Sequence, residues 1–233
     1  MIEKDARALR RNAAFVGTAF IVATAAGVAA AAIGNPLLEA PGYLGSLASD
    51  ESAARLAAFL TFFMSIACAG VGLGLYPILR RFSVGLAIGT VGFRLLESMT
   101  QVLSGAGVIG LLAVSQHYVD AGAPDPGWFL TVGGVIQSGS AWISNGVTLI
   151  FWCIGAFMYY GLFYHHRLVP RWLSVWGLTG ISVTVVTSSL VMIGAIPGFG
   201  TVQLVSNLPI ALQEMVFAVW LIAKGISIKE PAR

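Results

Sequence analysis

Six long apolar stretches make up most of this chain, and each is long enough to cross a lipid bilayer as a helix. A crossing needs about 20 predominantly apolar residues. The stretches predict membrane-spanning helices at about residues 12–34, 54–79, 84–115, 139–164, 171–196 and 203–224. Only 10% of the residues are charged, against about 25% in an ordinary soluble domain. We therefore predict an all-α integral membrane protein, in which residues 1–233 form a single transmembrane domain, a bundle of six helices.

Two of these regions are longer than one crossing requires. Residues 84–115 predict either one strongly tilted helix or a helix interrupted near Gly105 and Gly107. Residues 128–138 predict an extra interfacial helix that leads into the fourth span. The apolar pattern favours neither arrangement of residues 84–115, so both remain open.

The positive charges gather at the ends of the spans that six successive crossings place on one face. Eleven of the thirteen Lys and Arg residues lie there: Lys4, Arg7, Arg10, Arg11, Arg80, Arg81, Arg167, Arg171, Lys224, Lys229 and Arg233. The segments at the opposite face carry mainly acidic residues, with Arg55 as their one positive charge. Because positive loops stay in the cytoplasm, both termini are predicted to be cytoplasmic. These clusters also account for the net charge of +3, so membrane lipids, and not nucleic acid, are the expected partners.

Aromatic and small residues suggest how the spans are placed and packed. Tyr159, Tyr160 and Tyr164 at the end of the fourth span are typical of an aromatic belt at the inner interface. The patterns Gly70-x-x-x-Gly74 and Gly85-x-x-x-Gly89 predict close helix contacts, either within the chain or between copies. The oligomeric state does not follow from them.

Three ionisable residues lie inside the predicted spans, where a bilayer disfavours charge. Arg94 and Glu97 are in the middle of the third span, and Glu214 is in the middle of the sixth. An uncompensated charge at a helix centre costs about 2.5–3.5 kcal/mol. Arg94 and Glu97 are three residues apart and therefore neighbours on one helical face, which Gln101 extends. The spacing predicts an ion pair on a face that points into the bundle.

Other spans carry polar stripes as well. In the sixth span, Gln203, Asn207 and Glu214 recur near Pro209, whose ring leaves a backbone carbonyl without its usual donor. The fourth span carries one stripe formed by Gln137, Ser144, Asn145 and Thr148. The polar stripe of a membrane-spanning helix must face the interior of the bundle and not the lipid. The predicted ligand-binding residues are therefore Arg94, Glu97, Gln101, Asn145, Asn207 and Glu214.

Three functions fit this polar interior. The first is binding or transport of a small solute or a lipid-like ligand, for which one cation and two acids would line a cavity. The second is an intramembrane enzyme that uses Glu97 and Glu214 as acid and base. The third is a structural or accessory subunit in which the polar groups only hold helices together. One Arg cannot neutralise two acids, so one glutamate is expected to be protonated or to meet a ligand cation.

No motif predicts a cofactor, a metal ion or a nucleophile. His117 lies at the outer end of the third span, whereas His165 and His166 lie at the inner end of the fourth, so they cannot clamp one haem or metal. Cys68 and Cys153 lie inside apolar stretches, where a thiol behaves as a small hydrophobe. No nucleophile elbow and no phosphate-binding loop occurs.

Three stretches are similar to a known family. Phe93-Arg-Leu-Leu-Glu-Ser98, Leu168-Val-Pro-Arg-Trp-Leu-Ser-Val-Trp-Gly177 and Gln213-Glu-Met-Val-Phe-Ala-Val-Trp-Leu-Ile-Ala-Lys-Gly225 resemble a bacterial family of multi-helix membrane proteins catalogued as domain of unknown function 4386. The resemblance implies a location in the bacterial inner membrane and a single compact helical domain. It implies no activity.

Overall fold

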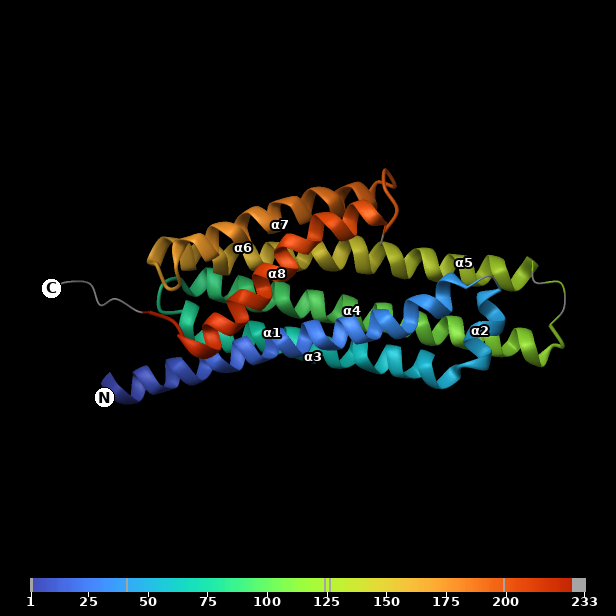
Figure 1. Ribbon diagram of the computed structural model, residues 1–233, viewed down its shortest axis with the longest axis horizontal. Helices are drawn as coiled ribbons and strands as arrows, with labels where there is room; N and C mark the ends of the chain where they lie inside the picture. Colours follow the sequence, from blue (N-terminus) through green and yellow to red (C-terminus); the bar gives the residue numbers. More distant parts are fainter. Residues whose placement is uncertain (1, 41, 124, 126, 199, 228–233) are drawn as a thin grey trace.

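The computed structural model describes residues 2–40, 42–123, 125, 127–198 and 200–227, and this part of the chain is helical, without a strand (Figure 1). The elements are α1 (Ile2–Glu39), α2 (Tyr43–Ser49), α3 (Glu51–Leu79), α4 (Val84–Asp120), α5 (Gly127–Trp142), the π-helical segment η1 (Ile143–Val147), α6 (Thr148–His166), α7 (Arg171–Met192) and α8 (Thr201–Ala223). Six helices are long and apolar enough to cross a membrane, with α5, η1 and α6 forming one of them. The all-α prediction and the number of apolar helices are confirmed.

The two overlong regions each form one continuous helix. α4 has 37 residues, about 55 Å at 1.5 Å per residue, and it continues through Gly105 and Gly107 without a break. Residues 128–138 do not form a separate interfacial helix, because α5 runs through η1 into α6 as one helix of 40 residues. The short α2 was not predicted, since seven residues carry too weak a periodic signal.

The helices form a closed ring. In the order α1, α3, α4, α6, α7 and α8, each helix packs against the next, and α8 returns to α1. α8 crosses obliquely from the side of α7 to the side of α1 (Figure 1). α7 and α8 end well before the far ends of α4 and α5, where α2 packs against α4.

The turns that carry the positive clusters lie at one end of the ring. The α3–α4 and α6–α7 turns, the beginning of α1 and the end of α8 meet there (Figure 1). The side chain of Lys4, together with Lys229 and Arg233, lies outside the described part of the chain. The other end of the molecule holds α2 and the α4–α5 turn.

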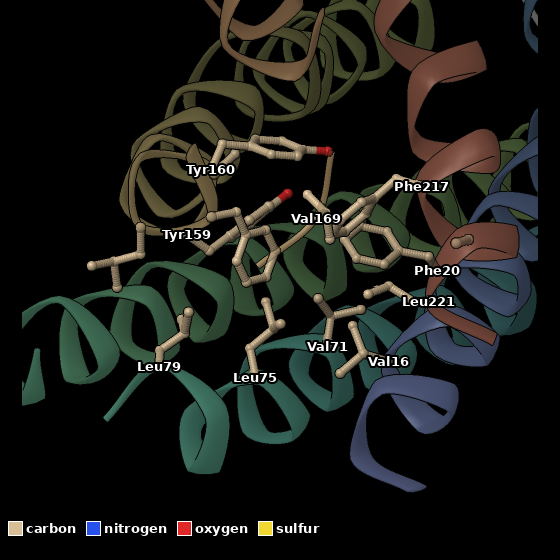
Figure 2. Close-up of a cluster of buried hydrophobic side chains, with 14 of the residues drawn as sticks. Val16, Phe20, Val71, Leu75, Leu79, Tyr159, Tyr160, Val169, Phe217 and Leu221 are labelled. Carbon is tan, nitrogen blue, oxygen red and sulfur yellow. The ribbon is translucent and has the colours of Figure 1, made fainter. Parts of the chain in front are cut away.

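An aromatic cluster fills the ring near its positive end (Figure 2). The ring centroids of Phe20 and Phe217 lie 5.7 Å apart, and the Tyr159 ring stacks on Phe217 at 6.4 Å. Tyr159 and Tyr160 are completely buried in this cluster, so their predicted place in an interfacial belt is wrong. For Tyr160 the reason is local: its hydroxyl donates to Gln213 Oε1 at 2.7 Å, and a phenol with an internal partner does not need the interface. Tyr159 is held by its ring contacts with Phe20 and Phe217.

Glycines allow α1 to approach its neighbours closely. A Cβ atom at Gly17 would lie 2.5 Å from the carbonyl oxygen of Ala218, and one at Gly74 would lie 2.7 Å from a methyl carbon of Val16. Gly17 therefore fixes where α8 crosses α1. Gly85 has open space around its Cβ position within the chain, whereas a Cβ at Gly89 would lie 2.6 Å from Met158 Sδ, so the second glycine pattern approaches a neighbouring helix at Gly89.

Candidate functional site

A buried ion pair lies at the centre of α4. Arg94 is 2% exposed and Glu97 is 4% exposed. The guanidinium Nη1 of Arg94 lies 3.0 Å from Oε2 of Glu97. Their three-residue spacing places both side chains on the face of α4 that points into the ring, as the sequence predicts.

Neighbouring groups hold this pair in place. Arg94 Nε donates to the carbonyl oxygen of Cys68 on α3 at 3.3 Å, and Gln101 Nε2 donates to Glu97 Oε1 at 3.2 Å. Gly72 allows α3 to approach the stem of Arg94, because a Cβ there would lie 2.9 Å from Arg94 Cβ. The Phe20 ring lies 5.7 Å from the guanidinium carbon, within range of a cation–π interaction.

A cavity of about 220 Å³ lies beside the pair, between α1, α3, α4, α6 and α8. Its polar lining consists of Thr24, Arg94, Glu97, Gln101, Thr148, Asn207 and Glu214. Its other lining residues are Phe20, Ala23, Met64, Cys68, Leu149, Trp152, Ile210 and Ala211. The cavity therefore combines an apolar wall with a cluster of polar groups, which is typical of small-molecule sites.

The cavity reaches the surface between α1 and α8. Ala211 on α8 is exposed, while Thr24 on α1 and Glu214 on α8 are half-buried. Thr24 and Glu214 lie near the middle of their helices. The mouth therefore lies at mid-depth of the candidate spans and not at an end of the bundle.

Two oxygen atoms in the cavity lining have neither a hydrogen-bond partner nor an ion-pair partner among the described residues. They are Oε1 of Glu214 and Oε1 of Gln101, and both are buried. Arg94 is already paired with Glu97, whereas Glu214 forms no ion pair within the described part of the chain. The lining thus offers acceptors that no donor of the described chain satisfies.

Five of the six predicted site residues line the cavity, and Asn145 does not. Asn145 lies in η1, where its Nδ2 donates to the carbonyl oxygen of Ala141 at 3.1 Å. Its own carbonyl oxygen accepts from Gln203 Nε2 at 3.0 Å. The prediction of a shared stripe assumed an α-helix, and the wider π-turn rotates Asn145 away from the face that Thr148 presents to the cavity.

Cys68 belongs to the site, although its position in the sequence did not predict this. Its carbonyl oxygen accepts from Arg94, and its Sγ lies 3.6 Å from Gln101 Nε2. Only the neighbouring Gly70, Gly72 and Gly74 signalled that this part of α3 approaches another helix closely. Within the described ranges, no group of three or more His, Cys, Asp or Glu side chains could hold a metal ion.

Six helices that are long and apolar enough to cross a membrane enclose a polar interior, an arrangement typical of the class of polytopic helical membrane proteins. The family model described as Domain of unknown function (DUF4386) matches residues 15–225, and the chain belongs to this family. Comparisons with curated proteins and with solved structures found no match.

Proposed function

We propose that this protein binds a small amphiphile with a cationic or hydrogen-bond-donating end, and that this ligand reaches the cavity from the bilayer. The proposal places the molecule in the bacterial inner membrane with both termini in the cytoplasm, as the positive clusters favour. The observation that carries it is the buried, unpartnered Oε1 of Glu214 at the mouth of the cavity.

The volume favours a small ligand or one end of a larger one. The cavity measures about 220 Å³, and a cavity of about 150 Å³ in another protein takes up benzene. A single ring or a short alkyl chain with one polar group therefore fits. The apolar wall formed by Phe20, Met64 and Ile210 would contact the carbon part of such a molecule.

The polar lining favours a ligand that donates hydrogen bonds. A buried carboxylate oxygen without a partner is costly, and the cationic or hydrogen-bond-donating end of a ligand supplies the missing partner of Glu214 Oε1. Arg94 does not serve an anionic ligand well, because Glu97 and the Cys68 carbonyl already occupy it. Among ligands of equal size, an ammonium is therefore expected to bind better than a carboxylate.

A series of amphiphiles with one chain and three end groups tests this order. Octylammonium, octanol and octanoate are each titrated into the purified protein, and binding is read from native mass spectrometry and thermal shifts. We expect the order octylammonium, then octanol, then octanoate. Glu214→Gln should lower the affinity for octylammonium about tenfold, which corresponds to the loss of one charge-assisted hydrogen bond. The affinity for octanol should not change.

Glu39→Gln is the matched control. Glu39 is exposed at the end of α1, so this substitution removes the same charge far from the cavity. Ala211→Trp at the mouth should reduce binding of octylammonium and octanol without unfolding the protein. Equal binding of octylammonium by the wild type and Glu214→Gln would contradict the proposal. A stability change in Glu214→Gln without any ligand effect would favour the structural role, and conversion of a lipid substrate would favour the enzyme.

A further inference from the structure

A second cavity lies at the positive end of the bundle, apart from the central one. It measures about 690 Å³. It is open to the surface and bordered by the α6–α7 turn, the first residue of α7, the end of α8 and the chain after it; its lining consists of residues 167–171, Trp220 and residues 224–227. No residue is shared with the central cavity, so the two sites can be tested independently.

The charge of this cavity is uniformly positive within the described residues. Arg167, Arg171 and Lys224 line it, and no carboxylate of the described chain does. Neither Arg167 nor Lys224 forms an ion pair with a described residue. Arg171 stacks its guanidinium at 5.2 Å over the ring of Tyr164, which fixes the side chain without neutralising it.

The backbone around the cavity is held in a defined shape. The Ser227 N–H donates to the carbonyl oxygen of Leu168 at 2.9 Å, which ties the chain after α8 to the α6–α7 turn. Gly225 turns the chain there with φ 71°, a value that suits glycine. Arg167 adopts φ 52°, although a glycine would fit this conformation more easily. A charged residue therefore stands where the backbone alone would favour glycine.

The beginning of α7 adds to the positive potential. Pro170 occupies the N-cap and provides no side-chain cap, so first-turn N–H groups of this 22-residue helix have no capping side chain. The amino end of a helix attracts anions, most of all beside cationic side chains.

We propose that this cavity binds a phosphate group, with Arg167, Arg171 and Lys224 as its charged ligands. The group belongs either to the headgroup of an anionic phospholipid or to a free phosphate. Arginine in particular recognises phosphate through paired hydrogen bonds. Trp220 in the lining provides an apolar surface for the glycerol or chain of a lipid.

The experiment compares phosphatidylglycerol, phosphatidylcholine and inorganic phosphate as probes on the full-length protein in detergent. Lipid retention is read by native mass spectrometry, and phosphate binding by calorimetry. The variant Arg171→Gln/Lys224→Gln should show a more than tenfold lower retention of phosphatidylglycerol, because each cation near a membrane surface raises the affinity for anionic lipid about fivefold. The control Arg80→Gln/Arg81→Gln removes two exposed cations from the α3–α4 turn and should change retention less than twofold.

The results distinguish a lipid headgroup from a free phosphate. Selective loss of phosphatidylglycerol with no response to inorganic phosphate supports a lipid headgroup, and phosphate binding that the double variant loses supports a free phosphate. Equal loss in the control variant, or binding of neither probe by the wild type, overturns the proposal. Arg167→Gly provides a second test if the double variant does not fold, because glycine suits φ 52° and the fold should persist while retention falls.

Discussion

Arg94 connects three parts of the bundle at the level of single atoms. It pairs with Glu97 on its own helix, donates to the Cys68 carbonyl of α3 and lies over the Phe20 ring of α1. Arg94→Leu would leave Glu97 buried without its cation. The free energy of unfolding should fall by about 3–5 kcal/mol, the usual penalty for breaking a buried pair, and thermal unfolding in detergent and in lipid measures this.

Two companion variants separate the charge from the packing. Glu97→Gln keeps size and hydrogen bonding and should be milder than Arg94→Leu. Arg94→Leu combined with Glu97→Leu removes both charges and should recover much of the lost stability. An unchanged melting temperature for Arg94→Leu would mean that Arg94 contacts water or lipid headgroups and does not form a buried ion pair with Glu97.

The residues of the site were predictable where regular helix geometry applies. The spacing of Arg94, Glu97 and Gln101 on α4 placed all three on one inward face, and the structure has them there. Asn145 was misplaced because η1 inserts a π-turn, and no spacing rule for an α-helix accounts for its rotation. Cys68 was missed because it acts through a backbone carbonyl, which every residue possesses.

The crossing of α1 and α8 depends on the absence of a side chain at one position. A Cβ at Gly17 would meet the backbone of Ala218, which cannot rotate away as a side chain can. Gly17→Ala should therefore force the two helices apart and lower the free energy of unfolding by about 1–3 kcal/mol. Thermal unfolding in detergent measures the loss.

Gly85→Ala is the matched control, since the Cβ position of Gly85 is open. This variant should be neutral, or stabilising by up to about 1 kcal/mol through helix propensity. If Gly17→Ala behaved like Gly85→Ala, the contact between α1 and α8 would not depend on the close approach at Gly17.

Helix positions were largely predictable, whereas the pairing of helices was not. Long apolar runs mark spans because the bilayer requires them, and α8 (Thr201–Ala223) lies within two residues of the range 203–224 that the sequence predicts. The closure of the ring through α8 and α1 depends on Gly17, and glycine at this position belongs to no pattern that the sequence analysis recognised. Gly85, which does belong to such a pattern, has open space around its Cβ position.

For the molecule as a whole, the expected orientation can be tested by cysteine labelling in intact cells. Ser49→Cys and Ala121→Cys lie at the end with α2 and the α4–α5 turn and should react with an impermeant thiol reagent. His165→Cys lies at the positive end and should react only after the cells are opened. All three positions are exposed, and the native Cys68 and Cys153 are buried, so background labelling should be low.

Wild-type protein controls for that background. Labelling of His165→Cys in intact cells, or protection of Ala121→Cys, would contradict a cytoplasmic location of the positive end. The sequence predicts this orientation through its charge clusters alone, since the distribution of Lys and Arg acts during insertion and leaves no trace in how the finished helices pack.

The mouth of the central cavity at mid-depth changes which concentration matters for the proposed ligand. A molecule that dissolves in lipid reaches this opening at its concentration in the bilayer and not at its concentration in water. Each added methylene raises partitioning into lipid about fourfold, from ~0.8 kcal/mol per group, although the cavity itself does not grow. Chain length would thus govern how much ligand arrives, and the polar end facing Glu214 would govern which of the dissolved molecules stay.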